Sequence, residues 1–352
     1  MSRVDLASLE KGLLAGDRGA LSRAITLIES NAPRHQEAAE RLLDCLMPHT
    51  GRSIRVGITG APGSGKSTFI ECLGGMLTAR AHRVAVLAVD PSSGVSGGSI
   101  LGDKTRMERL SVDPNAFVRP SPSAGSLGGV ASKTRESMLA CEAAGFDVVL
   151  IETVGVGQSE TTVADMSDFY LALMIPGAGD ELQGIKRGLL ELADMVAVNK
   201  SDGEMLAEAR RALATYRAAV HMSGGDEDWT VPVVSCSAHT GDGIAELWET
   251  IESRIGALRS DGRLEARRRA QMLRWMWSAV DDRLHAISRS GIGEDPTRAQ
   301  IIERVASGGI LPPIAARAFV DAVCLGIRNE SQRSDDEPAG PVAFSGSEGD
   351  AR

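Results

Sequence analysis

One eight-residue segment constrains the fold of this chain more than any other feature. Residues 60–67 read GAPGSGKS and match the pattern G-x-x-x-x-G-K-[ST] at every fixed position. An apolar, β-rich run from Ile54 to Thr59 precedes the segment, and Thr68 to Leu77 is expected to form a helix. A glycine-rich turn that merely joins a strand to a helix does not require the motif residue at every fixed position. The segment therefore predicts a phosphate-binding loop.

The residue types in this segment suit a polyphosphate. Gly60, Gly63 and Gly65 let backbone N–H groups wrap around phosphate oxygens, and the N-terminus of the next helix adds partial positive charge. Lys66 is expected to reach the β and γ phosphates, and the hydroxyl of Ser67 is expected to bind Mg²⁺. The residues expected to bind the nucleotide here are Gly60, Ala61, Pro62, Gly63, Ser64, Gly65, Lys66, Ser67 and Thr68.

A second motif predicts which base the nucleotide carries. The sequence Asn-Lys-Ser-Asp at 199–202 follows a strand-like run that begins at Met195, and α/β sheets bind their ligands at such strand ends. N-K-x-D is typical of GTPases, because the Asp202 carboxylate can accept hydrogen bonds from both the ring N–H and the amino group of guanine. Adenine offers neither donor in that arrangement. The carboxylate would then stay buried without a partner, which would disfavour adenine relative to guanine by a factor of roughly 10⁴ or more. We therefore expect GTP rather than ATP.

Neighbouring residues are expected to complete the base pocket. Asn199 should tie the motif to the phosphate-binding loop, and Lys200 should lie along the guanine ring and brace the loop. After the next strand, the segment SCSA at 235–238 resembles a loop that contacts guanine through backbone N–H groups. Ser237 and Ala238 would supply those groups, although a Ser-Ala pair also occurs in ordinary turns.

Two carboxylates at strand ends are candidates to hold Mg²⁺ and water. Asp90 follows the run Val84 to Val89 and suits Mg²⁺ binding or water orientation, while the plain alternative is an Asp-Pro turn. Glu152 begins the segment Glu-Thr-Val-Gly at the end of another strand, where many GTPases carry D-x-x-G. There the N–H of Gly155 would sense the γ-phosphate. Glutamate is one methylene longer than aspartate, so spacing alone leaves open a weakened motif or a distinct family.

Two glycine-rich stretches carry residues whose role the spacing leaves open. Asp103 precedes an expected helix and suits either a switch residue or an N-cap. Residues 176–186 follow a buried strand and are too rich in glycine and charge to form core. They form either a solvated loop or a functional one.

Composition limits the classes of protein that fit. The 352 residues include 38 basic and 47 acidic side chains, and the net charge of −9 leaves no electrostatic footprint for nucleic acid. No apolar stretch approaches the roughly 20 residues of a membrane span. Asp5 and Glu10 argue against an organellar presequence, and the five scattered cysteines predict reduced thiols rather than disulfides or a zinc site. We expect a cytoplasmic protein without a membrane or nucleic-acid partner.

Local patterns divide the chain into four parts. Residues 1–50 have apolar residues at helical spacing and predict a helical extension. Residues 51–260 alternate short apolar runs with amphipathic segments, which predicts an α/β domain whose central, mostly parallel sheet is flanked by helices. Residues 261–328 are again helical, and residues 329–352 predict a disordered acidic tail. The expected strands are Ile54–Thr59, Val84–Val89, Val148–Ile151, Leu171–Ile175, Val196–Val198 and Val233–Val234.

Several longer strings resemble one protein family. They lie at 89–93 (VDPSS), 96–107 (SGGSILGDKTRM), 119–123 (RPSPS), 152–160 (ETVGVGQSE) and 176–186 (PGAGDELQGIK). These strings are similar to those of the MeaB/ArgK group, which also includes the methylmalonic aciduria type A protein. The group consists of P-loop GTPases of the SIMIBI class that act as chaperones of adenosylcobalamin-dependent acyl-CoA mutases.

The resemblance, which spans roughly residues 42–284, implies a function and a set of site residues. The chain would hydrolyse GTP to GDP slowly alone and faster with the mutase, gate adenosylcobalamin loading, and protect or reactivate the mutase. The alternative is an older proposal for the family, a kinase that phosphorylates a periplasmic amino-acid-binding protein or another acceptor. By resemblance, catalysis involves Lys66, Asp90, Asp103 and Glu152, Mg²⁺ binding involves Ser67, Asp90 and Glu152, and switching involves Gly155, Gly177, Asp180, Glu181, Gln183 and Lys186.

An apolar stripe in the last third of the chain predicts a packing surface. Most such stripes are ordinary core, but members of the resembled family are homodimers joined through C-terminal helices. Trp275 and Trp277, in a chain that is only 3% aromatic, would suit an interface anchor. We therefore expect a homodimer, with residues 261–328 as its helical dimerisation arm. The stripe comprises Leu273, Met276, Trp277, Val280, Leu284 and Ile287.

Overall fold

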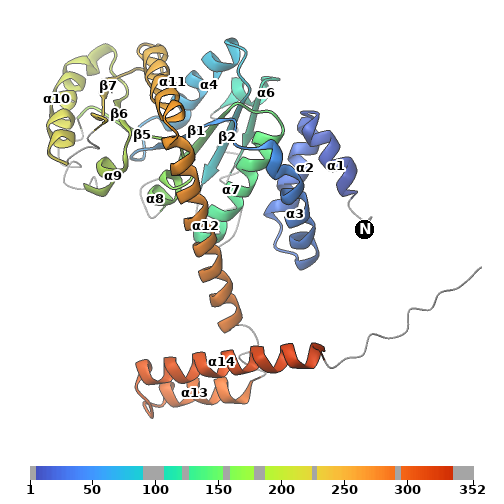
Figure 1. Cartoon of the computed structure of the whole chain (residues 1–352). Coiled ribbons are helices and arrows are strands. Elements are labelled where there is room, and N and C mark those ends of the chain that lie inside the picture. Colours follow the sequence, from blue (N-terminus) through green and yellow to red (C-terminus); the bar gives the residue numbers. More distant parts are fainter. Residues whose placement is uncertain are drawn as a thin grey trace, which may run out of the picture. The chain divides into compact units, whose positions relative to one another are not determined.

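The computed structural model describes residues 5–89, 107–120, 127–153, 159–177, 187–223, 228–289 and 295–335. The chain forms two units, Met1–Met276 and Trp277–Arg352. All of the described strands lie in the first unit (Figure 1).

A seven-stranded parallel sheet forms the centre of the first unit, in the order β3-β2-β4-β1-β5-β6-β7. β1 lies between β4 and β5, and its Val56 pairs with Leu150 on one side and Phe169 on the other. Because all pairs are parallel, the carboxyl ends of the strands meet at one edge, where such sheets bind ligands. The strands are β1 Ile54–Thr59, β2 Val84–Val89, β3 Ala116–Arg119, β4 Val148–Thr153, β5 Phe169–Met174, β6 Met195–Val198 and β7 Val233–Ser235.

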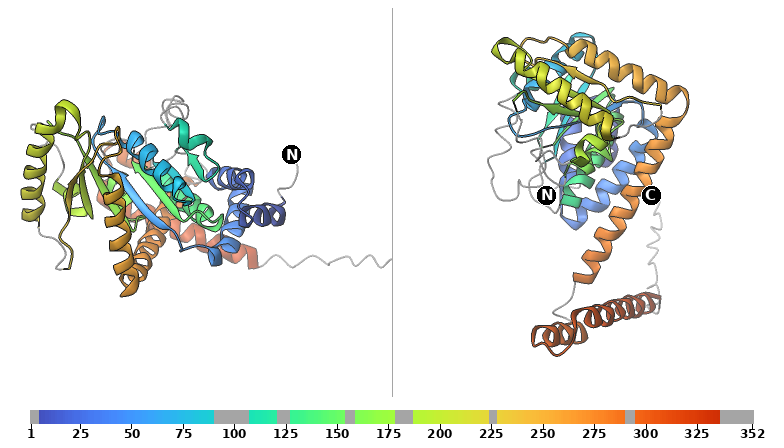
Figure 2. Two further views of the ribbon diagram at one scale, coloured as in Figure 1. Left: turned by 90° about the horizontal axis from the view of Figure 1, so that it is seen from above. Right: turned by 90° about the vertical axis from the view of Figure 1, so that its left-hand side faces the viewer.

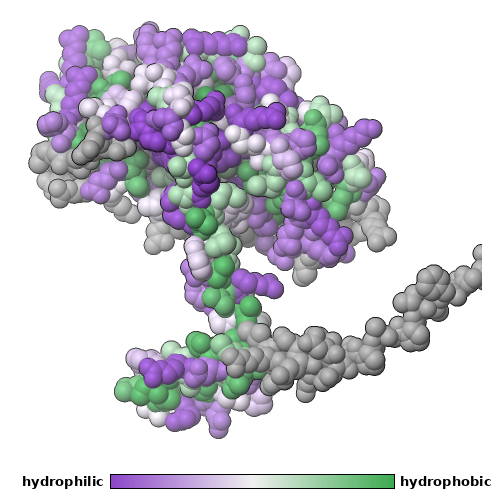
Figure 3. All heavy atoms as spheres, viewed as in Figure 1, coloured by the Kyte–Doolittle hydropathy of each residue, from purple (hydrophilic) through white to green (hydrophobic). Residues whose placement is uncertain are grey.

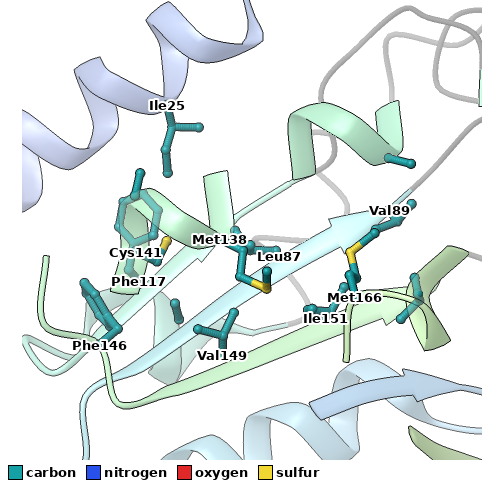
Figure 4. Packing of buried hydrophobic residues seen from close by; sticks show 14 of the residues in the cluster. Ile25, Leu87, Val89, Phe117, Met138, Cys141, Phe146, Val149, Ile151 and Met166 are labelled. Carbon is teal, nitrogen blue, oxygen red and sulfur yellow. The ribbon is translucent and has the colours of Figure 1, made fainter. Parts of the chain in front are cut away.

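Helices cover both faces of the sheet, because alternate residues of each central strand point to opposite sides. On β2, Leu87 belongs to the core of one face and Val86 to the core of the other. Figure 4 shows Leu87 beside Met138 of α7. The first face carries α7 Leu127–Ala143, α8 Ser159–Ala164, α9 Arg187–Leu192 and α10 Leu206–Ser223, and the second carries α4 Lys66–Ala79, α6 Glu108–Val112 and α11 Ile244–Ser260.

Three N-terminal helices extend the core of the first face. Leu13, Ile25 and Leu46 are fully buried in that core, and Figure 4 shows Ile25 directed toward it. The side chain of Asp17 caps one helix by accepting a hydrogen bond from the Ala20 N–H at 2.9 Å. The described residues before the sheet are therefore helical, as the sequence predicts, but they belong to the same unit as the sheet. These helices are α1 Leu6–Leu14, α2 Arg18–Glu29 and α3 Pro33–Leu46.

The strand predictions are confirmed with one omission. Each of the six predicted runs forms a strand of the sheet, with ends displaced by no more than a few residues. The sequence analysis misses β3, which has four residues and pairs with β2 through Val84 and Ala116. A run this short carries little local pattern, so its pairing with β2 defines it as a strand.

The C-terminal helices depart from the predicted boundaries in two places. Helix α12 (Arg263–Arg289) crosses from the first unit to the second after Met276, so residues 263–276 belong with the sheet and not with an arm that begins at 261. Helix α14 (Pro312–Asp335) runs beyond residue 329, where the sequence predicts a disordered tail. Glu, Gln and Arg extend an existing helix at little cost, which accounts for the additional turns. Residues 336–352 lie outside the described residues.

Helix α13 (Pro296–Ala306) lies beside α14 in the second unit (Figure 2). The side chain of Asp295 caps α13 by accepting hydrogen bonds from the N–H groups of Thr297 and Arg298. Across the described ranges, no helix has both the length and the apolar character that a bilayer span requires.

The apolar stripe of α12 is largely exposed. Leu273 is 59% exposed, Trp277 62% and Leu284 57%, and Figure 3 shows hydrophobic surface along this part of the helix. Trp275 differs from the predicted interface anchor, because it is half-buried and its indole N–H donates to the hydroxyl of Ser132 at 3.2 Å. An intramolecular contact thus holds the Trp275 side chain.

Candidate nucleotide-binding site

The glycine loop lies between β1 and α4 at the carboxyl edge of the sheet. Gly60 has φ +154°, and a Cβ at this position would lie 2.2 Å from the carbonyl oxygen of Leu173. Gly65 is the left-handed N-cap of α4 with φ +86°, and a Cβ there would lie 2.7 Å from Nδ2 of Asn199. Both positions therefore require glycine, and the loop has the strand–turn–helix setting that the motif predicts.

The side chain of Lys66 lies across this loop. Its Nζ donates to the carbonyl oxygen of Gly60 at 2.8 Å and to that of Ala61 at 3.3 Å. Burial lowers the pKa of Lys66, and the nearby carboxylate of Glu152 partly opposes that shift. The cation is thus held by neutral carbonyl oxygens that phosphate oxygens, with their negative charge, can replace.

Two of the predicted Mg²⁺ ligands are in contact. The hydroxyl of Ser67 donates to Oε1 of Glu152 at 3.0 Å. Glu152 is 5% exposed and lies on β4, the immediate neighbour of β1. Parallel pairing therefore brings a residue from the start of α4 and one from the end of β4 to the same point. Asp90, Asp103 and Gly155 lie outside the described residues.

Asn199 joins the base-reading loop to the phosphate-binding loop, as the sequence predicts. Its Nδ2 donates to the carbonyl oxygen of Ser64 at 2.8 Å, and its Oδ1 accepts from the N–H of Ala238 at 2.9 Å. The side chain is only 1% exposed, so both bonds are shielded from water. The next residue, Lys200, has φ +58°, a left-handed conformation that is uncommon outside glycine.

The carboxylate of Asp202 has no hydrogen-bond or ion-pair partner among the described residues, and the residue is half-buried. A base can therefore use its acceptor oxygens. The two backbone donors that the sequence predicts are already engaged, because the Ser237 N–H donates to Asp242 at 2.9 Å and the Ala238 N–H to Asn199. In this described loop the N–H of His239 makes no hydrogen bond. His239 is a candidate base contact that the sequence analysis overlooks, although it directly follows the Ser-Ala pair.

The predicted switch loop is described only at its start. Gly177 follows β5, is exposed and has φ +82°. The remaining predicted switch residues, Asp180, Glu181, Gln183 and Lys186, lie outside the described residues.

A parallel sheet with a glycine loop after its central strand, bonded to an Asn-Lys-x-Asp loop, defines a P-loop GTPase. The family model for "Methylmalonyl Co-A mutase-associated GTPase MeaB" matches residues 21–291. The chain therefore belongs to the MeaB family, and it is a GTPase.

Individual relatives agree with this assignment. A mouse protein named methylmalonic aciduria type A homolog, mitochondrial, is 46% identical over 328 residues, which cover 89% of this chain and 78% of that protein. The GTPase ArgK of Escherichia coli is 48% identical over 283 residues, covering 80% and 86%. A crystal structure of a LAO/AO transport system kinase has a TM-score of 0.72 at 36% identity and covers 92% of this chain and 99% of that one.

Proposed function

We propose that this GTPase is a chaperone that gates adenosylcobalamin loading and protects or reactivates a B12-dependent acyl-CoA mutase of the methylmalonyl-CoA mutase type. The observation that carries the proposal is the hydrogen bond between Ser67 and Glu152. It connects the phosphate site to the end of β4, two residues before Gly155 and the segment expected to respond to the γ-phosphate. The family description and the name of the mouse relative support a mutase as the client.

Mg²⁺ fits the oxygen donors of this site. Ser67 and Glu152 offer a hydroxyl and a carboxylate, and Mg²⁺ characteristically combines one or two protein ligands with water and substrate phosphate. Among the described residues, no group of three or more His, Cys, Asp or Glu is placed to hold a metal ion. When bound, the ion would neutralise charge on the β and γ phosphates. Asp90 remains a proposed third ligand.

The residues of the site then have distinct tasks. Lys66 exchanges the carbonyl oxygens of Gly60 and Ala61 for phosphate oxygens, and Asp202 accepts from guanine. Asn199 holds the two binding loops at a constant separation. Asp103 stays a proposed member of the hydrolysis region, and Gly155 together with 177–186 stays the proposed switch through which the mutase accelerates hydrolysis.

Dimerisation through the C-terminal helices is part of the proposal. Leu273, Met276, Trp277 and Leu284 expose apolar side chains on one long helix, and a contiguous exposed apolar surface is typical of a protein interface. Two copies of this chain would bury that surface. Analytical ultracentrifugation should show a dimer that Trp277→Glu converts to a monomer, and an unchanged dimer would contradict this assignment.

The decisive experiment compares hydrolysis of GTP and ATP by the full chain, with and without candidate cobalamin-dependent mutases. We expect GTP hydrolysis alone to be slow, ATP hydrolysis to be negligible, and the client mutase to accelerate GTP hydrolysis. Equal use of ATP would contradict the base assignment. Failure of every acyl-CoA mutase to stimulate the reaction would contradict the chaperone role.

A second candidate function is a kinase that transfers the γ-phosphate to an amino-acid-binding protein or another acceptor. The name of the similar solved structure, a LAO/AO transport system kinase, favours it. Radiolabelled GTP distinguishes the two functions, since a kinase leaves label on the acceptor whereas a GTPase releases it as free phosphate.

A further inference from the structure

A buried ion pair attaches helix α12 to the base of the sheet. Arg268 donates to both carboxylate oxygens of Asp168, at 2.8 and 2.6 Å. Asp168 also accepts from the backbone N–H of Arg55 at the start of β1, at 2.9 Å. Its side chain is fully buried and that of Arg268 is only 14% exposed. Breaking such a pair leaves a buried charge without a partner, so this attachment is rigid.

About two turns further along, α12 is attached by weaker contacts to α7 and to Asp165, which follows α8. Arg274 donates to Oδ1 of Asp165 at 3.1 Å, and both side chains are about half exposed. Trp275 donates to the hydroxyl of Ser132 at 3.2 Å, and the guanidinium of Arg135 lies 5.8 Å from the Trp275 ring. Arg135 also donates to the carbonyl oxygen of Asp165 at 3.4 Å. We call these five residues the α12 junction.

The junction includes Asp165, which directly follows α8, the first helix after the nucleotide-site strand β4. Glu152, which contacts Ser67, lies near the end of β4, and α8 begins at Ser159 in the same stretch of chain. Val163 of α8 is fully buried against β1, where a Cβ at Gly57 would lie 2.9 Å from its Cγ1. Because Val163 is closely packed, we expect α8 to move as one body. A displacement at the start of α8 would therefore also displace Asp165.

The junction also lies at the end of the first unit. The boundary between the units falls after Met276, one residue beyond Trp275. Exposed ion pairs contribute little net energy, roughly 0 to 1 kcal/mol, so the contacts of Arg274 can rearrange while the Arg268–Asp168 pair stays intact. A two-state coupling element can combine a rigid attachment, here Arg268–Asp168, with contacts that exchange, here those of Arg274.

We propose that the α12 junction transmits the nucleotide state from α8 to the C-terminal unit, with Arg274 and Trp275 as positioning residues. This proposal rests on the nucleotide-dependent chaperone function proposed above. Coupling is demonstrated when both sites bias the same two-state element. The experiment must therefore measure a nucleotide-dependent change in the C-terminal unit.

Native cysteines make that measurement possible in the full chain. Cys45 on α3 and Cys324 on α14 are exposed, whereas Cys72, Cys141 and Cys236 are half-buried or buried. Burial also raises the pKa of Cys72, which slows its labelling. Spin labels on Cys45 and Cys324 therefore report on one unit each. Double electron–electron resonance, with excess unlabelled protein to suppress distances between chains, gives their separation with GDP and with a non-hydrolysable GTP analogue.

We expect the wild-type distance distribution to differ between the two nucleotides. Arg274→Gln and Asp165→Ala should abolish that difference while affinity for both nucleotides stays within about twofold of wild type. The charge-swapped double variant, Asp165→Arg with Arg274→Asp, should restore it. Arg263→Gln is the control, because it removes other exposed ion pairs of α12, with Asp228 and Asp261, that lie away from the junction.

The coupling would be overturned if the wild-type distance distributions were identical with the two nucleotides. It would also be overturned if the difference between nucleotides persisted in both single variants. A wild-type chain that binds no GTP would overturn the proposed function itself, and nucleotide titration of the same samples detects that outcome separately.

Discussion

Removing the amide of Asn199 tests whether the two binding loops act as one site. Asn199→Ala deletes the hydrogen bonds to the Ser64 carbonyl and from the Ala238 N–H, at 2.8 and 2.9 Å. It also leaves both backbone groups buried without a partner. At about 1 to 2 kcal/mol for each bond, including the unsatisfied group, the total loss is about 2 to 4 kcal/mol. That loss corresponds to a change of about 30- to 1000-fold in an equilibrium constant.

Two measurements distinguish a loss of folding stability from a loss of nucleotide affinity. Urea unfolding without nucleotide measures the part that stabilises the folded chain, and isothermal titration with GTP measures the part that preorganises the loops. We expect lower stability and GTP affinity reduced by at least about tenfold. Ser201→Ala is the control, because it removes a bond of 2.8 Å to the Val198 carbonyl within the same loop. Wild-type GTP affinity and wild-type stability in Asn199→Ala would refute the reasoning.

Four further outcomes are expected. Asp202→Asn should shift the binding preference from guanine to xanthine nucleotides, since the amide donates where guanine also donates. Competition binding with XTP checks this, and unchanged GTP affinity would contradict the assignment of Asp202 to the base pocket. Lys186→Ala should leave GTP titrations unchanged and abolish stimulation by the mutase, whereas lost binding would argue against a switch. Gly60→Ala should abolish GTP binding, because its Cβ would lie 2.2 Å from a backbone oxygen; retained affinity would show that the loop can shift. Burial opposes ionisation of Glu142, but hydrogen bonds and charge from Arg55 outweigh it and lower the pKa. The carboxylate therefore stabilises the fold above its ordinary pKa of 4.5, and this contribution disappears as pH falls through the lower folded value. Glu142→Gln should lower the free energy of unfolding by about 3 to 5 kcal/mol at pH 7 and by progressively less in acid. Urea unfolding at pH 7 and at acid pH checks this, and an equal loss under the two conditions would contradict the ion pair.

Much of the nucleotide site is predictable because its pieces are contiguous in the chain. The glycine loop, the strand before it and the helix after it occupy adjacent residues, so local spacing defines them. The contact of Asn199 with the phosphate-binding loop was also predictable, since parallel strands bring their carboxyl ends to one edge. The engaged N–H groups of Ser237 and Ala238 were not, because their acceptors depend on how the loop folds back on itself.

The C-terminal region shows the opposite case. Its helical spacing predicts α12 and the apolar stripe, but spacing does not distinguish Trp275, which binds Ser132, from the exposed Trp277. Nor does it predict that Arg268 pairs with Asp168, which lies 100 residues earlier. Both contacts depend on where the helix lies against the first unit.

The amino-acid sequence by itself determines the parallel α/β class, the phosphate-binding loop and the guanine-reading motif of this protein, because each arises from residues that are neighbours in the chain. Only the tertiary structure decides that Ser67 meets Glu152, that β3 is a strand and that α12 is anchored before it enters the second unit. Those features depend on contacts between distant segments, whose partners are chosen by packing and not by local spacing.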